Sequence, residues 1–287
     1  MLRFLGGATL RLLLVMLMAS FTGAMLIRIA PGFSSDAQEL NAGLSAESLQ
    51  AIRQAHLADA NIPRFYARYL SSLLRGDLGV SRSLNQPVWD LLRDRLPVTL
   101  ANLGFALALG WLIALVLAIT TQMLKPRWFS FLADGLSGIF ISMPAAALAL
   151  IFVLLRLPPA FAAALLVFPS VYRYSQNLLR QSSEMPHVLT ARARGAGSWR
   201  ILAWHIVPVA LPQMIALVGV SISIGIGVLL PIEVFCDVSG IGQLAWQAAQ
   251  SRDLSLLVNL TVVITFITVC ATMLSDAVQR GMTRSVA

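Results

Sequence analysis

The most restrictive feature of this chain is a series of long apolar runs separated by short polar segments. Residues 96–124 contain no charged side chain and are numerous enough for a tilted helix to cross a bilayer. Over the whole chain 57% of residues are hydrophobic and 12% are charged, against about 25% charged in a typical soluble domain. Because lipid offers no hydrogen-bond partners to backbone N–H and C=O groups, such runs must form helices. The sequence therefore predicts an all-α integral membrane protein.

The apolar runs predict about six transmembrane helices. They cover residues 11–28, 96–124, 135–155, 157–172, 206–232 and 254–275. The first run is longer than a usual signal core, which favours an uncleaved transmembrane helix over a secretory signal. Pro144 should kink the third helix. The expected division is residues 1–95, a first transmembrane helix plus an external amphipathic segment, and residues 96–287, a membrane core of five helices.

A polar, arginine-rich segment, residues 184–212, separates two apolar runs in the second half of the chain. It must leave the bilayer on one side and form a defined structure there. Residues 187–194 and 199–205 predict two short helices, with Gly195 to Gly197 as the break and Ser198 as the N-cap of the second. The result is an elbow, which either lies on lipid headgroups or docks a soluble partner.

Basic residues predict the topology. With a cytoplasmic N-terminus, the short outside loops carry only Arg156 and Arg252, whereas the inside segments hold most of the remaining arginines. Both termini and the elbow are therefore expected to face the cytoplasm. The net charge of +8 comes almost entirely from arginine, since Lys125 is the single lysine. This excess indicates topology and anionic lipid, and the chain carries no nucleic-acid-binding motif.

Sequence patterns of catalysis are missing from the chain. A Walker A loop ends in Lys followed by Ser or Thr, but Lys125 is followed by Pro126. The three histidines have no metal-ligand spacing, and the two cysteines indicate neither a disulfide framework nor a metal site. We therefore expect no enzymatic activity, no metal and no cofactor in this chain.

Four segments, in the same order along the chain, resemble ABC importer permeases of the dipeptide/oligopeptide (and nickel) binding-protein-dependent transport family, as its B-type inner-membrane subunit. The first two are the string from Gly76 to Ser81 and the string from Arg95 to Leu100. The third, similar to the family's EAA loop within residues 184–208, comprises Thr190, Ala191, Arg192, Ala193, Arg194, Gly195, His205 and Pro208. The fourth, similar to its external loop, contains Glu233, Gly240, Gly242 and Asp253.

The resemblance implies a type I ABC importer permease fold in which the EAA-like loop is a cytoplasmic coupling helix seated in a groove of an ATPase subunit. The implied partners are a second homologous permease, two cytoplasmic ATPase subunits and an extracytoplasmic substrate-binding protein. ATP and Mg would be bound by the ATPases, and the chain would be a multi-pass protein of the bacterial inner membrane. Peptides are the leading substrate class, with nickel chelates, glutathione and sugars as alternatives, and the substrate-binding residues are unknown.

Two departures and two alternatives stay open. Only residues 156–159 separate the third and fourth runs, where the family carries a longer external insertion, and Ser239 replaces a usual proline. A secondary, ion-coupled transporter would need a functional charge inside the membrane, but Asp134, Glu233 and Asp276 fall at predicted helix ends. A non-transport membrane scaffold would explain the elbow but not the charge-free, proline-broken helices.

Overall fold

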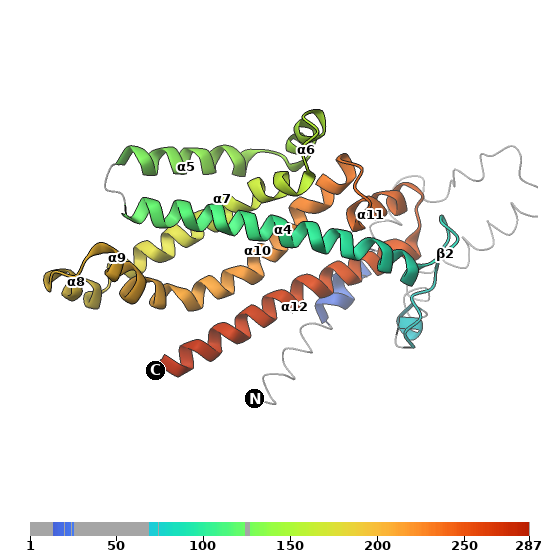
Figure 1. Cartoon of the computed structure of the whole chain (residues 1–287). Coiled ribbons are helices and arrows are strands. Elements are labelled where there is room, and N and C mark those ends of the chain that lie inside the picture. The colour runs from blue at the N-terminus through green and yellow to red at the C-terminus, as the bar shows by residue number, and fades with distance from the viewer. Residues whose placement is uncertain are drawn as a thin grey trace, which may run out of the picture. The chain divides into compact units, whose positions relative to one another are not determined.

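The computed structural model describes residues 14–19, 21–23, 25, 69–73, 75–123 and 127–286. These residues are almost entirely helical (Figure 1). They divide into two compact units. Unit 1 comprises Met1–Pro97 and Gln243–Phe266, and unit 2 comprises Val98–Gly242 and Ile267–Ala287. Ten residues of the first predicted helix are described, and all ten are helical, whereas most of the amphipathic segment that follows it lies outside the described residues.

The elements follow the predicted apolar runs with shifted ends. A short antiparallel hairpin pairs β1 (Val80–Ser81) with β2 (Gln86–Pro87), with Val80 opposite Pro87. The long helices are α4 (Val88–Met123), α5 (Arg127–Ser142), α7 (Pro159–Ser183), α10 (Val207–Phe235) and α12 (Leu254–Val286). The shorter ones are α6 (Ala145–Leu154), α8 (Pro186–Ala193), α9 (Ser198–Ile201), the π-helix η1 (Leu202–Ile206) and α11 (Ile241–Gln250).

Three helical stretches of the described chain are long and apolar enough to cross a membrane: Val88–Met123, Ser198–Phe235 and Leu254–Met282. A fourth span results if α5 and α6 count as one, although the two are bent by 96° at the break between them. We expected a single kinked helix over residues 135–155, which is wrong. Pro144 has an extended backbone and precedes α6 as its N-cap, so the chain turns sharply there.

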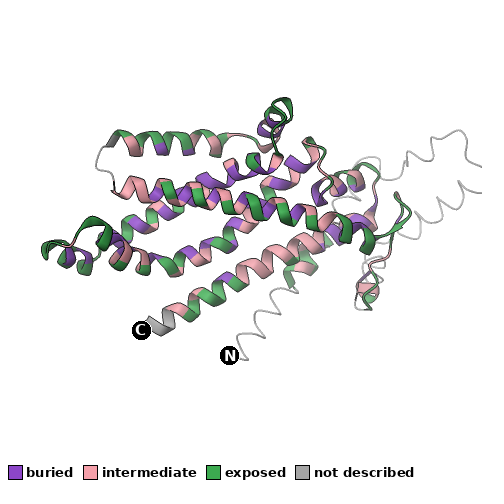
Figure 2. Ribbon diagram, viewed as in Figure 1, coloured by how far each residue is buried: buried purple, intermediate pink, exposed green. Residues whose placement is uncertain are grey.

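Unit 2 is organised around α7, which packs against α10 on one side and α5 on another. Its buried residues include Phe168, Tyr172 and Leu179, which belong to one continuous core with α4, α10 and the segment between α7 and α10. Figure 2 shows buried positions along these helices. Small residues allow close approach: a Cβ at Gly110 of α4 would lie 3.2 Å from the carbonyl oxygen of Ala164 on α7. Such contacts are typical of helices packed in membranes.

Unit 1 contains the hairpin and the first part of α12. Asn259 on α12 accepts a hydrogen bond from the Tyr69 hydroxyl (3.1 Å) and donates one to the carbonyl oxygen of Leu78 (2.9 Å). Gly76 and Gly79 have φ values of +77° and +75°, so the turn on either side of Asp77 favours glycine at both positions. The glycine-rich string is thereby held against α12.

Helix α11 was not predicted, because the sequence analysis described the segment after α10 only as similar to the family's external loop. The structure shows that Ile241–Gln250 is helical. Ile241, Leu244 and Ala248 are all buried and follow one another at helical spacing. This apolar periodicity is present in the sequence, and it favours a helix more strongly than the preceding glycines disfavour one.

Candidate functional site

The segment Pro186–Ile206 of unit 2, called the elbow below, comprises α8, a four-residue turn, α9 and η1. Helix α8 ends in a Schellman motif, in which the amide of Gly195 donates to the carbonyl of Arg192 (3.0 Å) and that of Ala196 to Ala191 (3.2 Å). Gly195 has φ +78°, a backbone conformation that side chains disfavour. The break was thus predicted at the right place.

The second half of the elbow differs from the expectation in two ways. Gly197, with an extended backbone and no side-chain bond, is the N-cap, and Ser198 is the first residue of α9, so the predicted serine cap is wrong. The helix also does not end at His205 but continues through the π turn into α10. Pro208 cannot donate to the carbonyl four residues earlier, and the wider π turn accommodates this lost bond.

The elbow is firmly attached to unit 2 by its inner face. Val188, Ala191, Ile201, Leu202 and Ile206 are buried in the same core as α7 and α10. Its outer face is open: the side chains of Trp199 and Trp204 are 66% and 76% exposed, and three arginines are exposed beside them. These arginines are Arg192, Arg194 and Arg200. The elbow is therefore an amphipathic element whose inner face is packed on the helices of unit 2 and whose outer face exposes tryptophan and arginine.

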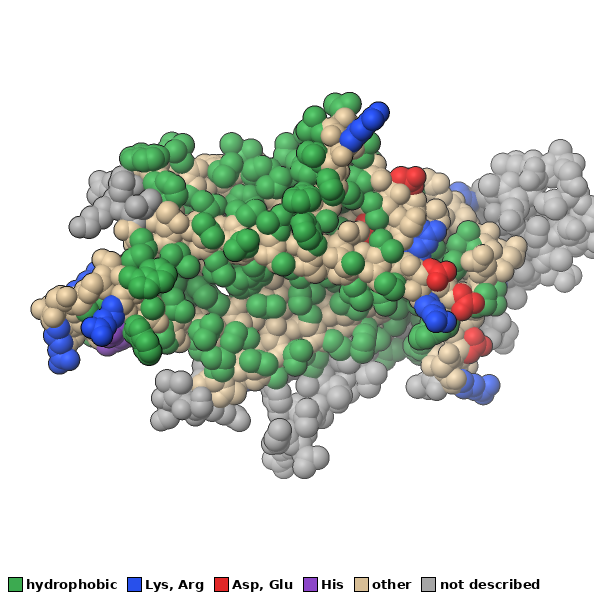
Figure 3. Space-filling model, viewed as in Figure 1, with side chains coloured by type: hydrophobic (Ala, Val, Ile, Leu, Met, Phe, Trp, Pro, Cys, Tyr) green, Lys and Arg blue, Asp and Glu red, His purple; other side chains and the backbone are tan. Residues whose placement is uncertain are grey.

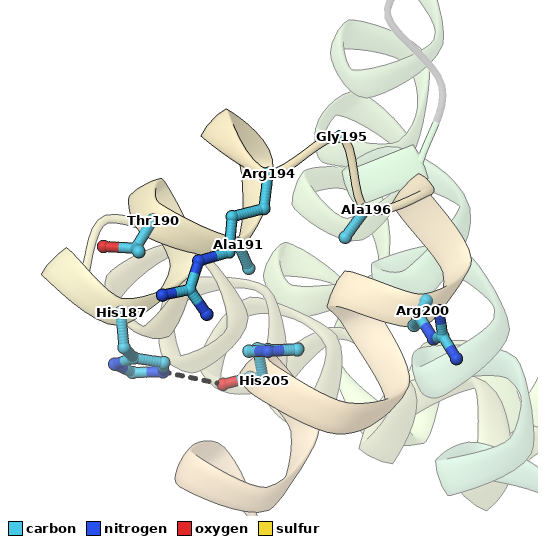
Figure 4. A pocket seen from close by; sticks show the side chains of 8 residues that line it. All are labelled: His187, Thr190, Ala191, Arg194, Gly195, Ala196, Arg200 and His205. Carbon is cyan, nitrogen blue, oxygen red and sulfur yellow. Dashed lines mark hydrogen bonds between the residues drawn. The ribbon is translucent and has the colours of Figure 1, made fainter.

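A hollow of about 640 Å³ lies between the two halves of the elbow (Figure 4). It is lined by His187, Thr190, Ala191, Arg194, Gly195, Ala196, Arg200 and His205. Nε2 of His187 is 3.1 Å from the carbonyl oxygen of His205, and because a carbonyl only accepts, this nitrogen carries the proton. The two imidazole rings are stacked with centroids 6.4 Å apart. In Figure 4 the Arg194 side chain extends toward the histidines, whereas that of Arg200 points away from them.

The hollow is cationic. None of its lining residues is acidic, and Nδ1 of His205 is buried without a hydrogen-bond partner among the described residues. Figure 3 shows basic side chains and a histidine gathered at this end of the visible face. Of the predicted site residues, Thr190, Ala191, Arg194, Gly195 and His205 line the hollow, whereas the remaining three do not. Those three are Arg192, Ala193 and Pro208.

Of the four predicted residues of the external loop, three belong to unit 2 and one, Asp253, belongs to unit 1. In unit 2, the Glu233 carboxylate is fully buried and accepts a hydrogen bond from the amide of Gly242 (2.7 Å). Gly240 and Gly242 pack closely around it, and a Cβ at Gly240 would overlap the carboxylate. Asp253 belongs to unit 1, where it caps α12 through the amide of Leu256 (3.1 Å).

Asp253 also holds the hairpin of unit 1, a role that no sequence pattern indicated. Its second oxygen accepts hydrogen bonds from the Ser81 hydroxyl (2.6 Å) and from the amide (3.0 Å) and hydroxyl (3.1 Å) of Ser83. The carboxylate is 2% exposed, so these bonds stabilise a buried charge. Its function is to join two segments that are far apart in the sequence.

A polar seam between α5 and α7 was missed by the sequence analysis. The hydroxyl of Tyr172 donates to Asp134 (2.9 Å), and Nε2 of Gln176 donates to that hydroxyl (3.0 Å). Nε of Arg173 donates to the Ser137 hydroxyl (3.0 Å), so this arginine bonds to α5. Asp134 was expected at a helix end, but it lies inside α5, and Asp276 likewise lies inside α12. The helical spacing of Ser130, Asp134 and Ser137 could have indicated the seam had α5 been started at residue 127.

The membrane-length helices and the exposed elbow anchored to them define a mainly helical integral membrane protein. Residues 91–287 match the profile of the family described as binding-protein-dependent transport system inner membrane components, and the chain belongs to this family. This confirms the resemblance stated from the sequence motifs. Family membership implies partners of two general kinds, a binding protein and an ATPase. Permease subunits of this family are not ATPases themselves, in agreement with the missing Walker A sequence.

Several characterised or provisionally named proteins are similar to this chain. A protein of Brucella suis biovar 1, provisionally named a peptide transport system permease, is 25% identical over 91% of each chain. The oligopeptide transport system permease protein OppB of Salmonella typhimurium is 25% identical over 83% of this chain and 84% of its own length. A chain of the inward-facing MetNI methionine ABC transporter is similar in fold, with a TM-score of 0.60 and 17% identity over 67% of this chain and 96% of that chain.

Proposed function

We propose that this chain is one of two homologous permease subunits of a type I ABC importer, with about six transmembrane helices. In this proposal residues 1–95 form a first transmembrane helix and an external segment, and residues 96–287 form the permease core. Helices of the two permeases line a central path, two ATPase subunits bind on the cytoplasmic side, and a substrate-binding protein docks on the other. The family assignment supports the general scheme.

The observation that carries the proposal is the construction of the elbow. Its inner residues, such as Val188 and Leu202, belong to the same core as α7 and α10, so a force applied to the elbow is transmitted to those helices. Its outer face exposes Trp199, Trp204 and three arginines, two of which line the cationic hollow. Aromatic and arginine side chains are the types most enriched where protein interfaces bind tightly. We therefore assign the elbow as the coupling element that contacts acidic groups of an ATPase subunit.

The proposed cycle is alternating access. ATP and Mg bind to the partner ATPases, whose closure moves the elbow as a rigid lever and opens the path outward to accept substrate. Hydrolysis reverses the movement. Such a cycle requires that ATP bind the two conformations with different affinity, because a ligand with equal affinity for both shifts neither.

The substrate in this proposal is peptide-like. This rests on relatives such as OppB, whose name describes an oligopeptide transport system permease. It also rests on the four motifs in the sequence. The proposed topology places both termini and the elbow in the cytoplasm, as the distribution of arginines predicts. The proposed location is the bacterial inner membrane, in agreement with the family description.

The test is to purify the tagged chain from its native membrane in mild detergent, identify co-purifying chains by mass spectrometry and assay ATPase activity. We expect a second permease and ATPase subunits. Gly195→Val, which strains the Schellman turn, and Arg192→Glu, which reverses an exposed charge, should each lower ATPase stimulation by substrate at least about tenfold. Gly197→Val is the matched control, because Gly197 has an ordinary backbone and open space around its Cβ position.

Two results would reject the proposal. A chain that is purified alone, and that shows no contact with ATPase subunits on crosslinking in intact membranes, would instead be a secondary transporter or a scaffold. An assembled complex whose activity is unchanged by Gly195→Val would show that the elbow is not the coupling element.

A further inference from the structure

A polar cavity of about 260 Å³ lies in unit 2, apart from the hollow of the elbow. It is lined by Thr121, Gln122, Ser130, Asp134, Gln176, Asn177 and Arg180. All of these described lining residues are polar, and two of them carry opposite charges. In a membrane protein, polar and charged side chains among the helices are costly and mark the routes of substrates or ions.

Three helices build the cavity by presenting polar stripes to one another. Helix α4 contributes its last turn, and α5 contributes residues 130 and 134, which are one turn apart. Helix α7 contributes residues 176, 177 and 180, which lie on one helical face. The start of α5 and the end of α7 lie toward the end of unit 2 that carries the elbow (Figure 1). In the proposed topology this is the side on which imported substrate leaves.

The acidic member of the cavity is held in a fixed position. One oxygen of Asp134 accepts a hydrogen bond from the Tyr172 hydroxyl (2.9 Å), and Gln176 in turn donates to that hydroxyl (3.0 Å). Tyr172 is fully buried, so it anchors the carboxylate to the core of unit 2. Asp134 itself is exposed, which leaves its second oxygen accessible from the cavity.

The basic member, Arg180, stands on the last turns of α7 with its side chain 76% exposed. It forms an ion pair with Glu184 at 3.5 Å, also exposed, and such a surface pair contributes little. The guanidinium can therefore exchange Glu184 for another carboxylate with little loss of free energy. The cavity thus offers a carboxylate from α5, a guanidinium from α7, and the amide side chains of Gln122 and Asn177.

We propose that this cavity binds the two charged ends of a zwitterionic solute, an amino acid or short peptide, with its ammonium group at Asp134 and its carboxylate at Arg180. The volume equals that of roughly nine water molecules, which suits a dipeptide of two small residues. The amide side chains would bind the peptide group. The inference rests on the proposed function, because it names a site on the cytoplasmic part of the path for a peptide-like substrate. Exposure of both charges makes it a weak site, as release requires.

The test measures binding through protection of a thiol in the cavity. Ser130→Cys, a nearly isosteric change at a lining residue that has no assigned contact with the probe, is introduced after Cys236 and Cys270 are replaced by Ala, and its modification by a thiol reagent is followed in the complete importer in lipid nanodiscs. The probes are di-alanine, N-acetyl-di-alanine, which lacks the ammonium, and di-alanine amide, which lacks the carboxylate. We expect di-alanine to protect, and each blocked probe to require at least about a tenfold higher concentration.

Charge-removing variants assign each end of the probe to one residue. Asp134→Asn should remove the discrimination between di-alanine and its N-acetyl form, and Arg180→Gln should remove the discrimination against the amide. Tyr172→Phe removes the bond to Asp134 but neither charge, so it should weaken protection without changing the order of the probes. Glu184→Gln breaks the ion pair of Arg180 outside the cavity and should leave protection unchanged.

Equal protection by all three probes, or no protection by any, would overturn the proposal. So would a Glu184→Gln variant that behaves like Arg180→Gln, because the arginine would then act only through its surface ion pair. Assembly with ATPase subunits and coupled ATPase activity are measured in the same preparation. An importer that assembles and couples but shows no protection refutes the cavity alone, whereas protection in a chain without partners refutes the proposed function alone.

Discussion

Gly195 and Gly197 stand two positions apart in the elbow, but their backbones differ. Gly195 has φ +78° and completes the Schellman motif of α8, whereas Gly197 has φ −64° and an extended backbone before α9. An added Cβ meets no atom within 4 Å at either position. The difference between the two glycines is therefore one of backbone strain and not of space.

We predict that Gly195→Ala lowers the free energy of unfolding by about 1 kcal/mol, because alanine disfavours a left-handed backbone. Gly197→Ala should change it by less than about 0.5 kcal/mol. Denaturation of the purified chain in nanodiscs, followed by tryptophan fluorescence, gives both values. Equal losses at the two positions would contradict the assignment of strain to Gly195.

Glu233 and Gly240 form a buried contact between the end of α10 and the turn after it. The nearest neighbours of a Cβ at Gly240 would all be atoms of the Glu233 carboxylate, which it would overlap. At Gly242 the neighbours include the backbone of Leu230. The two glycines therefore tolerate substitution differently once the carboxylate is removed.

We predict that Gly240→Ala destabilises unit 2 by about 1–3 kcal/mol by overpacking, and that the same change costs close to nothing in a Glu233→Ala background. Gly242→Ala should stay costly in both backgrounds, because the backbone of Leu230 cannot withdraw. Thermal unfolding of the original chain, the two single variants Glu233→Ala and Gly240→Ala and the double variant measures the coupling between these two residues. Additive losses for Glu233 and Gly240 would show that the contact between them does not govern this turn.

Among the elements, α10 connects the elbow to several helices of unit 2. It begins as a continuation of the elbow, packs along α7, and approaches α12 at Gly219. A Cβ at Gly219 would lie 2.8 Å from Cα of Thr272 and 2.9 Å from the carbonyl oxygen of Ala271. A small residue is required there for two helices to approach closely.

The α10–α12 contact predicts a clear difference between two glycines of one helix. Gly219→Ala should lower stability by about 1–3 kcal/mol, since the backbone of α12 would have to move. Gly227→Ala meets no atom within 4 Å and should be neutral or slightly stabilising, because alanine favours a helix. Melting temperatures in the same nanodiscs compare the two, and a loss at Gly227 as large as at Gly219 would count against the contact.

For the molecule as a whole, the distribution of arginine sets the expected orientation. The short loops that are expected outside carry two arginines, whereas the elbow alone carries three on its exposed face. The two compact units are joined by helices that belong to both, including α4 and α12. Thiol labelling from each side of the membrane can measure this orientation.

We predict that a thiol at Gly197→Cys reacts with an impermeant maleimide only in inverted vesicles, and that a thiol at Gln86→Cys, on the hairpin, reacts only from the outside. Both positions are accessible to solvent, and the background lacks Cys236 and Cys270. A chain with the opposite labelling pattern would have its elbow outside, which would exclude contact with cytoplasmic ATPases.

Local composition was enough to predict the membrane class, the positions of most helices and the break within the elbow. Helix α8 begins and ends within one residue of its predicted limits, because proline and glycine act on neighbouring backbone. The same local patterns gave wrong predictions where neighbouring elements changed the effect of a proline or glycine. Pro208 did not end a helix, since a π turn absorbed it, and α11 formed despite the glycines before it.

The contacts that make up the sites could not be predicted from local sequence patterns. Asp253 bonds to Ser81 across 172 positions, and Asp134 bonds to Tyr172 across 38. Apolar periodicity shows that a helix has an inner face, but it does not show which helix packs there or at what register. Membership of the permease family follows from the order of residues, whereas the polar cavity and the buried Glu233 depend on how separate helices pack together.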